Sequence, residues 1–217
     1  MYSEVTIVAG SDGGVSSLAS AFVGTGLFSE ESRSGTGTGT VVWLQYRGST
    51  DFYLKVYNST YVYAKVYKAD KTTAITSLSY RMSTGSPVKI YTNGYSVCIM
   101  CKDSYNLCVT GFTHGTTKYL GEGMLFYDGT ETWYADYSWD EYVQKTVSGK
   151  TILSPVHLMN SATNLLQDTA VDCLRYFSNP DGFSGNAPIT DGTSYYSKMF
   201  SSNTSDTADC LFKYTLT

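Results

Sequence analysis

The chain has 217 residues and a formal net charge of −4, and Gly and Tyr, with 20 residues each, far outnumber its 4 Pro. This composition is typical of β-sheets joined by polar loops, and the length can bury an adequate core in one β domain or two small ones. There is no cluster of Lys and Arg to neutralise phosphates, which argues against a nucleic-acid partner, and no stretch reaches the ~20 apolar residues of a membrane span.

The N-terminal part combines one predicted strand with a short helix. Residues 2–9 are expected to form the strand and residues 15–22 the helix, with a Gly-rich turn between them. Residues 24–40 are expected to be a loop that ends in a Gly/Thr-rich tract, whose glycines lack the lysine and the following helix of a phosphate-binding loop. We therefore predict an N-terminal segment with a Gly/Thr-rich arm at 1–39 and a β-rich domain at 40–217, and leave open a further division near 145–150.

Residues 40–68 carry the clearest pattern, an alternation of period two across three predicted strands. One face is aliphatic and is expected to lie on the core: Val42, Leu44, Tyr46, Phe52, Leu54, Val56, Val62, Ala64 and Val66. The other face, hereafter the ring face, combines aromatic residues with lysines: Trp43, Tyr53, Lys55, Tyr57, Tyr61, Tyr63, Lys65 and Tyr67.

The register of these strands follows from the requirement that the faces stay unmixed. A three-residue loop at 58–60 pairs Val56 with Val62 and Lys55 with Tyr63, whereas a two-residue turn would mix the two faces. The preceding strand should place Trp43 across from Lys55, where the ammonium group can form a cation–π contact with the indole ring.

The ring face is too apolar for an ordinary solvated surface and too rich in hydroxyl and amino groups for an ordinary core. It should therefore be covered. The cover is either a second layer of the same domain or a neighbouring copy, or else the face is a docking surface for a glycan, a peptide or another subunit.

The remaining elements are also mostly strands. They are predicted at 75–82, 87–91, 95–101, 105–112, 124–127, 130–134, 151–159, 171–177, 195–200 and 210–216, with a helical turn at 161–168. The hairpin at 95–112 is apolar on both faces and should be central. The whole is predicted to be all-β and mainly antiparallel, with a β-sandwich or barrel-like fold and short helices.

Two roles are open to the cysteines: they can bind a metal ion or form a disulfide. Cys98, Cys101, Cys108 and His114 are residue types that bind zinc, but residues three apart in a strand point to opposite faces, so we expect no metal and no cofactor. A hairpin centred on Asp103 would place Cys98 opposite Cys108, as packed thiols or, in an oxidising setting, as a disulfide. Synthesis in a cytoplasm favours free, buried thiols.

A catalytic site is harder to build. The two histidines, His114 and His157, lie in no recognisable nucleophile motif. Carboxylates beside aromatic rings, as in a glycosidase, occur in one patch that includes Glu131, Trp133, Asp136 and Trp139. The alternative is that the tryptophans anchor the core and the carboxylates are solvated, and we expect no enzyme.

The first five residues lack the basic region and apolar stretch of a secretory signal, which predicts synthesis in a cytoplasm. With its Ser/Thr/Gly/Tyr-rich strands, the Gly/Thr tract at 34–40 and a Tyr-rich, Lys-poor surface, the chain is similar to virion proteins of tailed bacteriophages and prophages. The resemblance implies a structural component of a capsid, neck, tail or fibre, made in the bacterial host cytoplasm and located in the virion, that assembles with other virion proteins or copies of itself. A carbohydrate-binding β-sandwich and a glycoside hydrolase-like enzyme are the alternatives.

Overall fold

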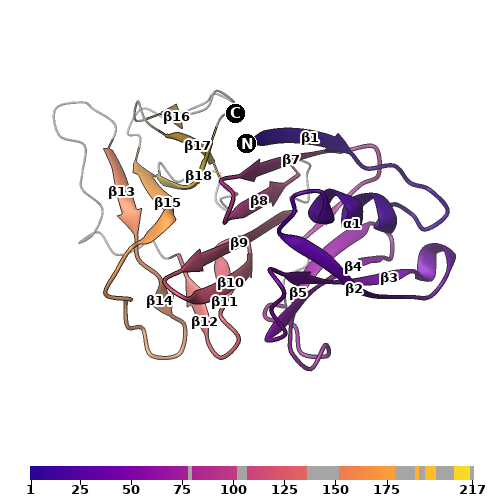
Figure 1. The fold of residues 1–217 in the computed structure, drawn as a ribbon, viewed down its shortest axis with the longest axis horizontal. Helices are drawn as coiled ribbons and strands as arrows, with labels where there is room; N and C mark the ends of the chain where they lie inside the picture. Colours follow the sequence, from indigo (N-terminus) through magenta and orange to yellow (C-terminus); the bar gives the residue numbers. More distant parts are fainter. Residues whose placement is uncertain are drawn as a thin grey trace.

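The computed structural model describes residues 1–77, 80–101, 107–135, 152–178, 189–190, 194–198 and 208–215. In these residues the strands form three sheets, in which all pairings are antiparallel, and the central one lies between the other two (Figure 1). The predicted all-β, mainly antiparallel and sandwich-like fold is confirmed, and none of the sheets in the described residues closes into a barrel.

The central sheet contains, in spatial order, β1 (Tyr2–Thr6), β7 (Pro87–Thr92), β8 (Val97–Met100), β9 (Cys108–His114), β10 (Thr117–Glu122), β11 (Leu125–Tyr127), β12 (Thr132–Tyr134) and β14 (Met159–Asn160). The sheet that we call the meander sheet contains β2 (Phe28–Ser34), β3 (Val41–Tyr46), β4 (Phe52–Asn58), β5 (Val62–Lys68) and β6 (Arg81–Met82). The C-terminal sheet contains β13 (Ile152–Val156), β15 (Val171–Ser178), β18 (Ala208–Tyr214), β17 (Tyr195–Lys198) and β16 (Ile189–Thr190).

The central sheet is buried on both faces, as its apolar hairpin predicted. On one face Val97, Ile99 and Val109 pack with the aliphatic side of the meander sheet and with the helix α1 (Val15–Val23). On the other face Cys98 and Phe112 pack with the C-terminal sheet. Alternate residues of one strand therefore belong to two different cores.

The predicted strand registers are wrong by two residues in the β4–β5 hairpin and in the β8–β9 hairpin, although the predicted faces are right. Val56 pairs with Ala64 and not with Val62, so that the loop comprises residues 59–61 instead of 58–60. Likewise Cys98 pairs with Thr110, and Cys108 pairs with Met100. A shift of two residues leaves every side chain on its own face, so the period-two pattern cannot detect it.

The segment before residue 40 is integrated into the sheets. The prediction of a loop over 24–40 is wrong, because β2 pairs with β3 along this segment and a 3₁₀ turn, η1 (Gly37–Gly39), follows it. β1 pairs with β7 at an edge of the central sheet. β2 is an edge strand that is exposed after Phe28 and carries a bulge between Glu30 and Ser32.

Other predictions were wrong in detail. The strand β10, in the middle of the central sheet, was not expected; it pairs with β9, which ends at His114. The strand expected at 75–82 is limited to β6 in the described residues. Residues 161–168 form a turn and no helix, while the further division that was left open near 145–150 lies outside the described residues. No described helix has the length and apolarity to span a bilayer.

Candidate functional site

The ring face occupies the side of the meander sheet that points away from α1, because α1 packs on the aliphatic side. Trp43 lies on β3, and Tyr61 lies in the loop before β5. The other six ring-face residues alternate with core residues along β4 and β5. Tyr53 is 8% exposed and the remaining seven ring-face residues are half-buried. Apart from Tyr53, the rings are therefore neither fully buried nor freely solvated.

Lys55 lies at the centre of the ring face. Its Nζ is 5.4 Å from the ring centroid of Trp43, 5.1 Å from that of Tyr57 and 5.5 Å from that of Tyr67. Trp43 pairs with Lys55 across β3 and β4, which confirms the predicted pairing and the cation–π contact. Three rings around one ammonium group hold the side chain over the sheet, where each contact contributes about 0.5–1 kcal/mol when exposed.

A second cation covers the neighbouring rings. Lys71 lies in the turn after β5, and its Nζ is 4.3 Å from the ring centroid of Tyr53 and 5.7 Å from that of Trp43. The same ammonium group is 2.7 Å from Oε1 of Glu31 on β2. Lys71 has φ 56, a left-handed conformation. It therefore reaches the ring face from a turn, where no periodic pattern could have revealed it.

The turn that carries Lys71 is fixed by Asp70. Both carboxylate oxygens of Asp70 accept hydrogen bonds, from the backbone N–H groups of Thr72 and Thr73 and from the hydroxyl of Thr73. These bonds hold the pKa of Asp70 well below its usual range.

The observed register also stacks the tyrosines of neighbouring strands. Tyr57 and Tyr63 pair directly, and their rings lie parallel with centroids 5.0 Å apart and an interplanar angle of 10°. Trp43 meets Tyr67 edge to face at 5.3 Å. At the loop end Arg81 covers the ring of Tyr61 at 4.4 Å. The ring face is thus an ordered surface on which cations and rings interlock.

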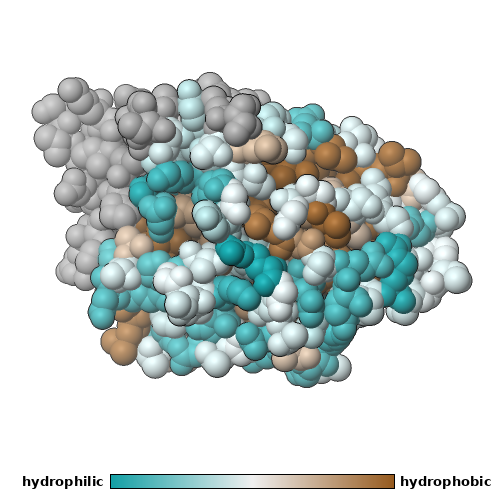
Figure 2. Space-filling model, in the orientation of Figure 1, coloured by the Kyte–Doolittle hydropathy of each residue, from teal (hydrophilic) through white to brown (hydrophobic). Residues whose placement is uncertain are grey.

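Hydrophobic residues gather on the other side of the meander sheet as well. Figure 2 shows them around α1, where Val8 and Val23 are 67% and 38% exposed.

The second predicted patch is only partly described, since Asp136 and Trp139 lie outside the described residues. Trp133 packs against the core between the central and C-terminal sheets, and its Nε1 donates a hydrogen bond to Oδ2 of Asp128 at 2.9 Å. Burial opposes ionisation of Asp128, but hydrogen bonds from the backbone of Glu131 and Thr130 lower its pKa. The carboxylate of Glu131 accepts a hydrogen bond from the side chain of Asn160. Both described members of the patch have structural partners.

All five cysteines are free and buried. The hydroxyl of Thr110 donates to Sγ of Cys98 at 3.4 Å, and burial, followed by the neighbouring Cys108, raises the pKa of the Cys98 thiol. Among the described residues no group of three or more His, Cys, Asp and Glu is arranged to hold a metal ion. His114 Nε2 lies 2.8 Å from Thr169 Oγ1, and His157 Nδ1 lies 2.9 Å from the carbonyl of Gln167.

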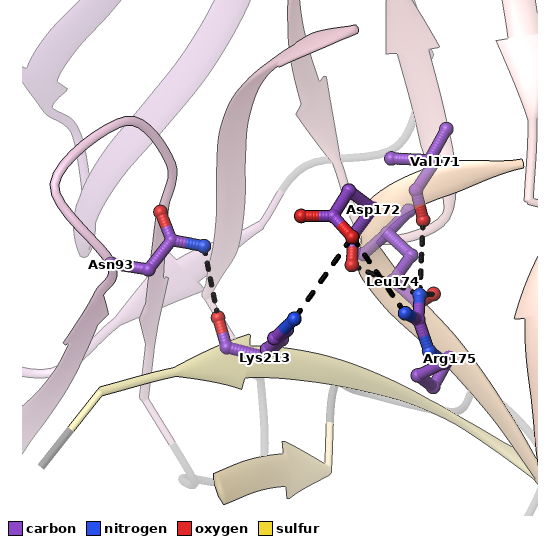
Figure 3. Close-up of polar contacts among 6 residues, drawn as sticks. All are labelled: Asn93, Val171, Asp172, Leu174, Arg175 and Lys213. Atoms are coloured by element: carbon purple, nitrogen blue, oxygen red, sulfur yellow. Dashed lines mark hydrogen bonds and ion pairs between the residues drawn. The ribbon is translucent and has the colours of Figure 1, made fainter. Parts of the chain in front are cut away.

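A polar cluster in the C-terminal sheet stabilises an irregular strand. The register between β13 and β15 shifts, so that Pro155 pairs with Arg175 and Val156 pairs with Val171. One nitrogen of the Arg175 guanidinium donates to the carbonyls of Val171, Asp172 and Leu174 within the bulge (Figure 3). The guanidinium of Arg175 satisfies backbone carbonyls of the bulge. We therefore do not assign the cluster to a ligand.

Comparison with known proteins gives no match: no family model, no curated protein and no solved structure is significantly similar to this chain.

Proposed function

We propose that this chain is a non-enzymatic structural protein of a phage-like particle, a component of its capsid, neck, tail or fibre, that assembles with copies of itself or other virion proteins through the ring face. The single observation that supports this most strongly is the ring face itself. It presents eight half-buried or buried aromatic and lysine side chains on three paired strands and the loop between two of them. Aromatic residues on a rigid surface are typical of protein–protein interfaces.

The geometry favours a protein partner over a glycan. A sugar needs a free face of an aromatic ring for stacking, but the indole of Trp43 has the ammonium groups of Lys55 and Lys71 within 6 Å of its centroid. The rings of Tyr53 and Tyr67 meet the same indole edge to face. A sugar would have to displace at least one lysine, whereas a protein surface can cover the rings and lysines as they stand.

The contacts of the two described members of the predicted enzyme patch support a non-enzymatic role. Trp133 packs against the core between the central and C-terminal sheets, and Glu131 and Asp128 are engaged in hydrogen bonds that form a turn and fix a neighbouring strand.

The test is incorporation into particles. The protein is co-expressed with the proteins encoded beside its gene, and particles are isolated by sedimentation. The wild type is expected to sediment with the particles, whereas the double variant Tyr57→Ser, Tyr63→Ser should stay in the supernatant because the stacked pair is lost. Tyr95→Ser is the control, since Tyr95 is 68% exposed and lies outside the ring face. Absence of the wild type from particles, or equal incorporation of all three proteins, would contradict the proposal.

A further inference from the structure

Two lysines of the ring face lie directly opposite each other. Lys55 on β4 pairs with Lys65 on β5, between the pairs Tyr53–Tyr67 and Tyr57–Tyr63. Like charges directly opposite in a sheet are destabilising. Among the described residues no carboxylate forms an ion pair with either ammonium group. The rings compensate Lys55, but no described ring lies over Lys65.

The acidic residue Glu122 interacts electrostatically with Lys65 but does not neutralise it. Glu122 is 1% exposed and accepts a hydrogen bond from the backbone N–H of Val66. Burial raises the pKa of Glu122 to about 8, against the opposing effects of that hydrogen bond and of Lys65. Near neutral pH the carboxyl group is therefore mostly protonated, and it carries too little negative charge to neutralise the lysine pair.

The basic residues of the chain are concentrated in the segment that contains the ring face. Residues 41–81, which contain the ring face, carry six basic and two acidic residues, a net charge of +4. The rest of the chain carries nine basic and seventeen acidic residues, a net charge of −8 with the histidines neutral. The segment that carries the ring face is thus basic and the rest of the sequence is acidic, so the two have complementary charges between copies.

We propose that the ring face docks on an acidic surface of a second copy of this chain, whose carboxylates lie against Lys55 and Lys65. This inference rests on the proposed function and names the partner of the same surface. Two ring faces would repel each other, so the contact joins different surfaces of the two copies. Head-to-tail contacts of this kind close into a ring when the rotation between copies allows it and otherwise extend.

The experiment is sedimentation velocity and light scattering of the purified full chain. Self-association is expected at low ionic strength, about 0.02 M NaCl, and its loss at about 0.5 M, where surface charges are screened. The double variant Lys55→Gln, Lys65→Gln should weaken self-association about tenfold or more. Lys89→Gln, Lys118→Gln is the matched control, because it changes the net charge equally on the central sheet and should associate like the wild type.

If loss of Lys55 disturbs the fold, the single variant Lys65→Gln still tests the inference, since no described ring or carboxylate is paired with Lys65. Near-UV circular dichroism checks that each variant is folded. A wild type that stays monomeric at low salt, association that is insensitive to salt, or equal behaviour of the two double variants would overturn the inference. A monomeric protein that still enters particles would refute docking between copies and leave the proposed function standing. A self-associating protein that never enters particles would refute the proposed function and leave docking between copies standing.

Discussion

The carboxyl group of Glu122 on β10 accepts a hydrogen bond from the backbone N–H of Val66 on β5, and so joins the central sheet to the meander sheet. Its other oxygen, Oε2, is buried without a hydrogen-bond partner in the part of the chain that the structure describes. A buried carboxyl group with one satisfied oxygen is costly to ionise, which is why its pKa is raised from 4.5 to about 8.

This residue should make stability depend on pH. Between pH 4.5 and 8 the native state keeps the proton of Glu122 whereas the unfolded chain releases it, so the free energy of unfolding falls as pH rises. The fall is on the order of a few kcal/mol, since one pKa unit corresponds to about 1.4 kcal/mol. Urea denaturation of the wild type and Glu122→Gln across this range should show a smaller slope for the variant. Parallel curves would show that Glu122 ionises normally.

Gly111 on β9 should be intolerant of a side chain. A Cβ at this position would lie 2.8 Å from the ring of Tyr46, which is fully buried and whose hydroxyl donates to the carbonyl of Tyr95 at 2.7 Å. Gly111→Ala is therefore expected to lower the free energy of unfolding by about 1–3 kcal/mol through overpacking. Gly39→Ala is the control, since a Cβ there meets nothing within 4 Å. Chemical denaturation measures both, and an unchanged midpoint for Gly111→Ala would show that the Tyr46 ring can move aside.

Arg175 should matter more than an ordinary surface arginine. Arg175→Met removes the donor to three carbonyls of the β15 bulge and should cost about 1–3 kcal/mol of stability, because two of these hydrogen bonds are part-buried and their acceptors lose a partner. Arg33→Met breaks an exposed ion pair with Glu30 and should cost less than about 1 kcal/mol. Thermal or urea unfolding of the two variants makes the comparison. Equal, small effects would mean that solvent satisfies the bulge carbonyls.

The thiols should be chemically silent in the folded protein. All five cysteines are buried, and burial raises the pKa of Cys173 to about 12 and that of Cys98 well above its usual value. A disulfide-exchange reagent is expected to react slowly with the native protein at pH 8 and to titrate all five thiols after denaturation. Rapid labelling of the native protein, or fewer than five thiols after denaturation, would contradict this arrangement.

The sequence predicts faces better than it predicts partners across strands. Val42, Leu44 and Val56 are fully buried as expected, because the burial of one side forces every second residue to be apolar. The pairing of Lys55 with Lys65 was missed for a related reason. A shift of two residues preserves both faces, and the loop at 59–61 contains no Gly or Asn whose conformation would fix its position.

The elements that were missed lack an apolar period. β2 is a polar edge strand, so solvent replaces the packing that would have imposed a pattern on it. β10 alternates irregularly, because Gly121 and Glu122 occupy buried positions in it. Within the candidate site, Lys71 and Arg81 reach the rings of Tyr53 and Tyr61 only through tertiary structure, which no local spacing encodes.

The bulged outer strand of the meander sheet has a consequence for how the protein behaves when crowded. An open strand edge normally invites pairing with other chains and growth into fibres. At β2 the register break beside Glu31 and the exposed charges of Glu30 and Arg33 interrupt the ladder that an incoming strand would need. Many copies can therefore accumulate at high concentration without strand pairing between molecules at this edge. Ordered contacts between copies then form through the broad surfaces of the molecule.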